Sequence, residues 1–220
     1  MDRISLIEDY PAMIADRLLN DEIDVGLIPV AMIPALTESH IITDFCIGAE
    51  KEVASVAIFS DVPLEQVEKV LLDYQSRTSV NLAKILLKEY WKKDVILEDA
   101  TLDFRDKIKG TTAGVVIGDR ALEQIAISRY MYDLAAAWKD HTGLPFVFAA
   151  WVANKQLNDG FIEAFNLANA YGVNHIDEVL DTVSYDVYDL KKYYTQNLSY
   201  LLTPEKRMGL QLFLEKLKQL

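Results

Sequence analysis

The sequence predicts an α/β protein of two lobes, with a ligand cleft between the lobes and a helical C-terminal tail. The first two thirds of the chain alternate short apolar runs, typical of strands, with segments of helical period, and the last third is helical in period throughout. Two apolar runs, Val53–Phe59 and Phe146–Ala153, bracket a block that has strands and helices of its own. We therefore expect both runs to be crossover strands, so that residues 1–57 with 150–220 form the first lobe and residues 58–149 the second.

The expected strands are short runs of aliphatic and β-branched residues that end at turn residues. In chain order they are Asp2–Tyr10, Asp21–Val30, Ile41–Ile47, Val53–Ser60, Val70–Leu72, Asp94–Glu98, Thr112–Asp119 and Phe146–Ala153. The expected helices repeat apolar residues every three or four positions. In chain order they are Ala12–Leu19, Ala31–Leu36, Leu64–Val67, Val80–Leu87, Arg120–Ile127, Met131–Lys139, Phe161–Tyr171, Ile176–Val183, Asp186–Gln196 and Pro204–Lys218.

The overall composition limits the classes of partner. The 220 residues are 51% hydrophobic, which is enough for two lobes that each bury a core. With 22 basic and 34 acidic residues the net charge is -12, so we expect neither nucleic acid nor anionic membrane surfaces as partners, because Lys and Arg carry phosphate binding. The single cysteine, Cys46, excludes an internal disulfide. No run approaches the ~20 apolar residues of a membrane span and the first residues do not resemble a signal peptide, so we expect a soluble cytoplasmic protein.

A hydroxyl-rich turn separates one buried strand from the helix that follows it. Ser76, Arg77, Thr78 and Ser79 lie where the free N–H groups of the first helical turn point outward. Three hydroxyls and a guanidinium beside these donors are suited to hold a carboxylate or a phosphate. The turn lacks the G-x-x-x-x-G-K pattern of a phosphate loop, so a carboxylate is the expected ligand. Ser and Thr are also the favoured N-cap residues of any helix, and capping is therefore the alternative interpretation.

Other short motifs accompany this turn. They are Ser55-Val56-Ala57 before Val62-Pro63-Leu64, Ile117-Gly118-Asp119-Arg120-Ala121-Leu122, Asp133-Leu134, Trp138, and Thr142-Gly143-Leu144-Pro145-Phe146-Val147-Phe148-Ala149-Ala150-Trp151. In this order and at these separations, the set resembles the chorismate dehydratases of the futalosine route to menaquinone. The resemblance extends from about Val25 to Trp151, and the helical tail agrees in kind. It implies the fold of the type II periplasmic binding proteins, which agrees with the two-lobed architecture expected from the strand order.

The resemblance also implies a reaction and a set of site residues. Chorismate would lose water to give 3-[(1-carboxyvinyl)oxy]benzoate, and the enzyme would mainly fix the conformation and help hydroxide to leave. Ser55 corresponds to the catalytic serine at the substrate, and the turn of residues 76–79 would seat a substrate carboxylate. Asp119 and Phe146 are further candidates for substrate binding. The structural alternatives are a hydroxyl bonded within its own sheet for Ser55, a helix cap for Asp119 and a core ring for Phe146.

No residue of these motifs is an obvious general base. His40, His141 and His175 all lie outside the motifs, so we expect surface or capping roles for them. We therefore expect a carboxylate of the substrate to accept the proton while the protein holds it in place. No cluster of Cys and His at metal-ligand spacing is present, and we expect neither a metal nor another cofactor.

One departure from the family pattern lies at the N-terminus. Members of the family begin with a strand that carries an S-Y-L-N-like segment with an active-site asparagine, and no S-Y-x-N occurs before Val25. We therefore expect the first lobe to lack its first strand, which would make catalysis by this chain doubtful. The alternatives are a non-catalytic binding module for a small carboxylate and, less favoured, the related naphthoate-forming enzyme of the same pathway, which uses a histidine base. The acidic surface and the helical tail are compatible with a homodimer.

Overall fold

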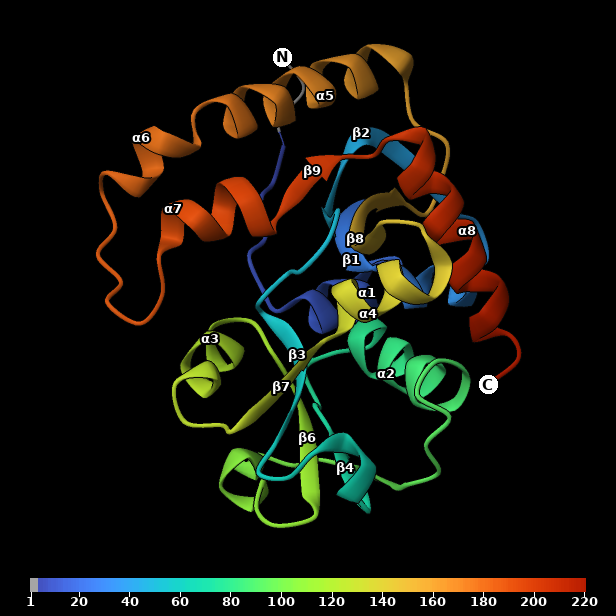
Figure 1. The fold of residues 1–220 in the computed structure, drawn as a ribbon. Coiled ribbons are helices and arrows are strands. Elements are labelled where there is room, and N and C mark those ends of the chain that lie inside the picture. Colours follow the sequence, from blue (N-terminus) through green and yellow to red (C-terminus); the bar gives the residue numbers. More distant parts are fainter. Residues whose placement is uncertain (1–3) are drawn as a thin grey trace.

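Two β-sheets organise the computed structural model, which describes residues 4–220. One sheet has four strands in the order β1-β8-β2-β9, and the other has five strands in the order β5-β4-β6-β3-β7. In Figure 1 the four-stranded sheet lies in the upper half of the molecule and the five-stranded sheet in the lower half, with helices α1 and α4 near their junction. The chain passes from the first sheet to the second before β3 and returns in β8.

The four-stranded sheet is centred on β8 (Phe146–Ala153), which is antiparallel to β1 (Val25–Pro29) and to β2 (His40–Ala49). The short strand β9 (Ser199–Leu201) pairs with the outer side of β2. Helix α1 (Pro11–Leu19) begins with a proline at its first position and packs the side chains at positions 14, 15 and 18, one helical face, into the core beside β1.

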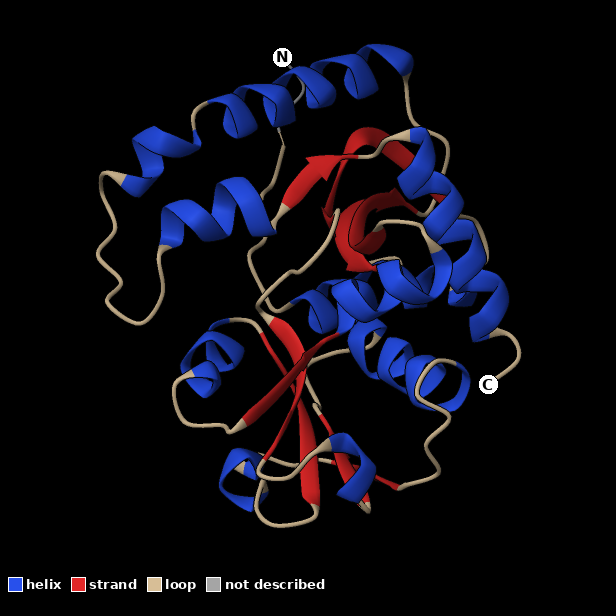
Figure 2. Ribbon diagram, viewed as in Figure 1, coloured by secondary structure: helices blue, strands red, loops and turns tan. Residues whose placement is uncertain are grey.

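The five-stranded sheet mixes two strand directions. The parallel part is formed by β4, β5 and β6, and β3 runs antiparallel to both β6 and β7. The strands are β3 (Val56–Ser60), β4 (Lys69–Leu72), β5 (Ile96–Asp99), β6 (Thr112–Ile117) and β7 (Tyr130–Asp133). Three helices follow strands of this sheet: α2 (Thr78–Glu89) after β4, α3 (Asp119–Ile125) after β6 and α4 (Leu134–Thr142) after β7. Figure 2 shows these helices beside and above the upper end of the lower sheet.

The last part of the chain is mostly helical and returns to the four-stranded sheet. Its elements are α5 (Asp159–Asn174), α6 (Ile176–Leu180), α7 (Leu190–Lys192), the π-helix η4 (Tyr193–Asn197), β9 and α8 (Pro204–Leu217). Helix α5 lies across the top of the view in Figure 1 and contacts β2. Short 3₁₀-helices η1 (Val30–Ala35), η2 (Leu64–Gln66) and η3 (Phe104–Lys107) complete the fold.

In the described residues the buried apolar side chains form two clusters, and the larger one draws on elements of both sheets. At its centre the Phe146 ring meets Trp138 of α4 at 5.3 Å and Phe213 of α8 at 5.1 Å, in edge-to-face geometry. The lobe boundaries expected from the sequence lie near residues 57 and 150. Both positions fall within strands, β3 and β8, and the division into lobes stays a prediction. Within residues 4–220, no helix combines the length and the apolar character needed to cross a membrane.

Several sequence-based expectations require correction. The expected strand Asp2–Tyr10 has no regular structure over residues 4–10, and residues 2 and 3 lie outside the described part. The expected helix Met131–Lys139 begins only at Leu134, because its first three residues belong to β7 and the Asp133 side chain caps the helix. The tail was expected to be helical throughout, but it contains the strand β9. A strand of three residues is too short for its alternating pattern to be recognised in the sequence.

Candidate functional site

One edge of the five-stranded sheet gathers the chemically distinctive motifs. Strands β4 and β6 are parallel, so their carboxyl ends lie at the same edge. Strand β3 runs in the opposite direction, so it begins at this edge: Val56 pairs with Ile117, and the Gly118 N–H donates to the Ser55 carbonyl at 2.8 Å. The edge therefore brings together Ser55, the turn of residues 76–79 and Asp119, which lie far apart in the sequence. We call it the β4/β6 edge.

The other half of the molecule contacts the β4/β6 edge through two hydrogen bonds. The Ala31 N–H, in η1, donates to Thr78 Oγ1 at 3.2 Å. The Tyr193 hydroxyl, in η4, donates to Ser55 Oγ at 2.8 Å. The β4/β6 edge thus faces the elements of the four-stranded sheet.

The hydroxyl-rich turn enters α2 through a side-chain cap. Ser76 Oγ accepts a hydrogen bond from the Ser79 N–H at 3.0 Å, and the Ser76 N–H donates to the Asp73 carbonyl at 3.1 Å. Ser76, Thr78 and Ser79 are buried, whereas Arg77 is exposed. Ser76 therefore serves as a helix cap, and carboxylate binding by the turn stays a prediction.

An ion pair between a buried carboxylate and a partly exposed guanidinium, which the sequence alone did not indicate, fixes this turn to α3. The Asp73 carboxylate has a side chain with 0% exposure, and Arg120 Nη2 lies 2.7 Å from its Oδ2. The same carboxylate accepts the N–H groups of Gln75 at 3.0 Å and Ile117 at 3.2 Å, and Arg120 also donates to Gln75 Oε1 at 2.7 Å. Because a charged pair with this many hydrogen bonds holds one geometry, the turns after β4 and β6 keep a fixed relative position.

The backbone before Ser55 is held in an unusual conformation. Ala54 has φ of 63°, in the left-handed region that costs a residue with a Cβ about 1–2 kcal/mol. Asp133 Oδ2 accepts the N–H groups of Val53 at 2.9 Å and Ala54 at 2.7 Å, while its Oδ1 accepts two N–H groups of the first turn of α4. Burial raises the pKa of Asp133, and the four N–H donors oppose this rise. One carboxylate thus holds the strained approach to Ser55 and caps α4.

Asp119 and Phe146 occupy different surroundings. Asp119 is exposed at the first position of α3, whose N-cap is Gly118 with φ of 64°, so Asp119 lies at the β4/β6 edge without being the cap residue. Phe146 is 1% exposed in the aromatic core, and it pairs with Ala49 in the four-stranded sheet. Substrate contact by either residue stays a prediction.

Each histidine contacts a partner away from this edge. His40 Nε2 lies 2.6 Å from Glu38 Oε1, and His141 Nε2 lies 3.4 Å from Glu89 Oε2. His175 Nδ1 lies 2.6 Å from the carbonyl oxygen of Tyr171. Among residues 4–220, no group of three or more His, Cys, Asp or Glu side chains has the arrangement to hold a metal ion.

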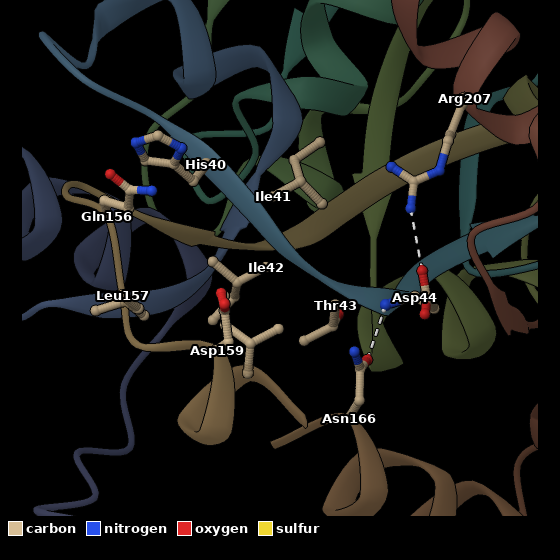
Figure 3. A pocket seen from close by; sticks show the side chains of 11 residues that line it. His40, Ile41, Ile42, Thr43, Asp44, Gln156, Leu157, Asp159, Asn166 and Arg207 are labelled. Atoms are coloured by element: carbon tan, nitrogen blue, oxygen red, sulfur yellow. Dashed lines mark hydrogen bonds and ion pairs between the residues drawn. The ribbon is translucent and has the colours of Figure 1, made fainter. Parts of the chain in front are cut away.

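Two pockets lie in the upper half of the molecule and contain none of the candidate residues. The first, of about 420 Å³, lies between β2, the segment before α5, α5 itself and α8 (Figure 3). Arg207 and Asp44 form an ion pair of 3.3 Å at one side of this pocket, and the Asp44 N–H donates to Asn166 Oδ1 at 2.9 Å. The second, of about 500 Å³, lies between the α5–α6 junction and the segment of η4 and β9.

Sequence comparison relates the chain to menaquinone biosynthesis. A family model described as menaquinone biosynthesis matches residues 1–219. A chorismate dehydratase of Thermus thermophilus is 27% identical over 241 residues, an alignment that covers 96% of this chain and 86% of that protein.

Structural comparison relates the fold to binding proteins. A protein of Archaeoglobus fulgidus matches with a TM-score of 0.66 at 14% identity, covering 97% of this chain and 84% of its own. A protein of Parabacteroides distasonis described as an ABC transporter matches with a TM-score of 0.65 at 17% identity, covering 96% and 80%. The aliphatic sulphonate binding protein of Escherichia coli matches with a TM-score of 0.56 at 16% identity, covering 95% and 77%. The predicted α/β fold of periplasmic-binding-protein type is therefore confirmed.

Proposed function

This chain belongs to the menaquinone biosynthesis family, and we propose on that premise that it is a chorismate dehydratase, a carbon–oxygen lyase that forms 3-[(1-carboxyvinyl)oxy]benzoate. The observation that carries the proposal is the β4/β6 edge, because Ser55 and the turn of residues 76–79 lie at the same edge of the sheet. The similarity to a chorismate dehydratase supports the choice of substrate. We place chorismate between the two expected lobes, residues 1–57 with 150–220 and residues 58–149.

The reaction removes one water molecule from a ring that becomes aromatic. A carbon–hydrogen bond and the neighbouring carbon–hydroxyl bond break, and the electron pair of the first forms the new ring double bond. The proton and the hydroxide leave as water, so atoms and charge balance without an oxidant or a reductant. Aromatisation makes the step downhill, and the protein has to hold the reactive conformation and stabilise the departing hydroxide.

Two groups at the β4/β6 edge suit these tasks. Arg77 and the first-turn N–H groups of α2 provide positive charge and donors for one carboxylate of chorismate. Ser55, which is 3% exposed, would donate its hydroxyl proton in a hydrogen bond to the departing oxygen. Because His40, His141 and His175 lie away from this edge, we assign proton removal to a carboxylate of the substrate itself. Asp119 would complete the polar lining.

The direct test is to follow chorismate by ultraviolet absorbance with the purified protein and to identify the product by mass. Formation of the enolpyruvyl benzoate supports the dehydratase. Exchange of Ser55 for Ala should lower kcat, and Arg77→Gln should raise KM without lowering the melting temperature. Arg129→Gln, a matched loss of charge in the loop before β7, should change neither constant.

Replacement of the histidines tests the assignment of the proton acceptor. Each of His40→Gln, His141→Gln and His175→Gln should retain kcat within about threefold, since none of these side chains contacts the β4/β6 edge. Collapse of kcat in one of them, with chorismate still bound, would make that histidine the base and would remove the substrate carboxylate from this role.

A non-catalytic binding protein is the second candidate. It is favoured by the structural similarity to a sulphonate binding protein, whose ligand is a small organic anion by its name. This candidate predicts that chorismate raises the melting temperature while no product forms. If chorismate neither reacts nor shifts the melting temperature, both candidates fail for this ligand.

A further inference from the structure

Ser55 has a hydrogen-bond partner from a distant part of the chain. The Tyr193 hydroxyl donates to Ser55 Oγ at 2.8 Å, although the two residues are 138 positions apart. Ser55 Oγ can accept this bond with one lone pair and still donate its own proton elsewhere. Burial raises the pKa of Tyr193, so the phenol keeps its proton at neutral pH and remains a donor. The contact thus limits the directions in which Ser55 can point its O–H.

We propose that Tyr193 is a positioning residue for the dehydration: its hydroxyl fixes the rotamer of Ser55 so that the Ser55 O–H points toward the substrate. This inference rests on the proposed function and extends it to a residue outside every motif of the family resemblance. Tyr193 would not touch the substrate and would act through Ser55.

The backbone of Ser55 is already fixed before Tyr193 contributes. The Gly118 N–H donates to the Ser55 carbonyl at 2.8 Å, and the Ser55 N–H donates to the Val53 carbonyl at 2.7 Å. The left-handed Ala54 that precedes it is held by the Asp133 carboxylate. With the backbone held on both sides, Ser55 can still rotate about its Cα–Cβ bond. The hydrogen bond from the Tyr193 hydroxyl restricts this rotation.

The segment that carries Tyr193 also has a rare backbone conformation. Tyr193 opens the π-helix η4, in which the Leu198 N–H donates to the Tyr193 carbonyl at 2.9 Å. Single π-turns of this kind are rare and frequently occur at functional sites. The buried Asn197 anchors η4, because its Oδ1 accepts the Tyr188 hydroxyl at 3.1 Å and its Nδ2 donates to the Glu52 carbonyl at 3.4 Å. The phenol therefore reaches Ser55 from a π-helix whose last residue, Asn197, is anchored by two hydrogen bonds.

Steady-state kinetics of Tyr193→Phe with chorismate test the proposal. The substitution keeps the ring that packs edge-to-face on Tyr188 and Tyr194, and it removes only the hydroxyl. We expect kcat to fall about 10- to 100-fold with KM within about threefold, the size of effect that misplacement of a catalytic group produces. The matched control Tyr194→Phe removes the hydroxyl of the next residue, which is not the partner of Ser55 or of Asn197, and it should keep kcat.

A double-mutant cycle separates positioning from general loosening of the fold. In a Ser55→Ala protein, adding Tyr193→Phe should leave the residual kcat unchanged, because the hydroxyl has nothing left to orient. An equal loss in both backgrounds, or an unchanged kcat in Tyr193→Phe, would overturn the positioning role while the dehydratase proposal stands. Lack of turnover in the unsubstituted protein would instead refute the dehydratase proposal, and with it the role of Tyr193. If Tyr193→Phe does not fold, Ser55→Thr is measured in its place. Threonine keeps the hydroxyl that accepts the Tyr193 hydrogen bond but restricts its side-chain rotamer. A kcat within about tenfold of the unsubstituted protein would support the rotamer set by Tyr193 as the reactive one, and a larger loss would overturn it.

Discussion

The carboxylate of Asp133 connects the strained backbone before Ser55 to the start of α4, and its replacement by Asn gives a measurable test. The two oxygens accept four backbone N–H groups, two from Val53 and Ala54 and two from the first turn of α4. Asn keeps the size of the side chain but has one oxygen, so its amide nitrogen must face one pair of these donors. Two buried N–H groups therefore lose their acceptor in either orientation.

The expected loss of stability follows from this count. A hydrogen bond to a charged group contributes about 1.5–3 kcal/mol, so the loss of two predicts a decrease of at least about 3 kcal/mol in the free energy of unfolding. For a chain of this size, that decrease corresponds to a fall of roughly 6–12 °C in the melting temperature. Asp140→Asn, at an exposed position of the same helix, is the matched control and should shift the melting temperature by less than about 2 °C.

Replacement of Ala54, whose φ is positive, by Gly tests the same contact from the backbone side. Gly removes the strain of about 1–2 kcal/mol at φ of 63°, while its greater freedom in the unfolded chain costs about 0.4–1 kcal/mol. Ala54→Gly alone should therefore be neutral or slightly stabilising, and it should recover part of the loss in Asp133→Asn. The melting curves should be measured by calorimetry and by urea titration. A melting temperature of Asp133→Asn within 2–3 °C of the unsubstituted protein would refute the role assigned to this carboxylate.

Three further predictions concern the core and the C-terminal helix. Burial raises the pKa of the Cys46 thiol to about 11, so a thiol reagent at neutral pH should label it slowly until urea unfolds the protein. The hydrogen bond from Lys216 lowers the pKa of Glu89 below its value of 4.5, so the stability that this pair provides is present above pH 4.5 and is lost as the pH falls through the lowered pKa. Lys216→Met should therefore cost about 0.5–1 kcal/mol at pH 7, and urea titrations should show the difference disappear in acid. Phe146→Leu should lower the free energy of unfolding by about 1–3 kcal/mol in the same titration, while a changed KM for chorismate would instead place its ring at the substrate.

The elements that the sequence predicted correctly have a strong local signal. The buried side chains of α2 include Leu82, Ile85 and Leu86, at the helical spacing from which the helix was expected. The strand Phe146–Ala153 was predicted with the bounds that β8 has in the structure, while its expected crossover role stays a prediction. Strand β7 was missed because it directly precedes α4, and the Asp133-Leu134 pair, an N-cap residue before an apolar run, was the signal that could have placed the start of the helix.

Contacts between distant segments were beyond the reach of the sequence. The π-helix that contains Tyr193 lies in a tail whose apolar residues have helical spacing on both sides of it. Such periodicity predicts a helix but does not show that this segment contacts Ser55 at the start of β3. The pairing of Asp73 with Arg120 likewise depends on β4 and β6 being neighbours in the sheet, which a single sequence does not state.

The turn of residues 76–79 shows how the structure sharpens an ambiguous motif. The sequence left capping and anion binding equally open, because both use the same N–H groups and hydroxyls. In the structure Ser76 Oγ is occupied by the Ser79 N–H and Thr78 Oγ1 by the Ala31 N–H. Arg77 is exposed, and no ion pair involves its side chain within residues 4–220. Since a cap requires no charge, Arg77 is the residue of this turn whose replacement affects a bound carboxylate without affecting the helix.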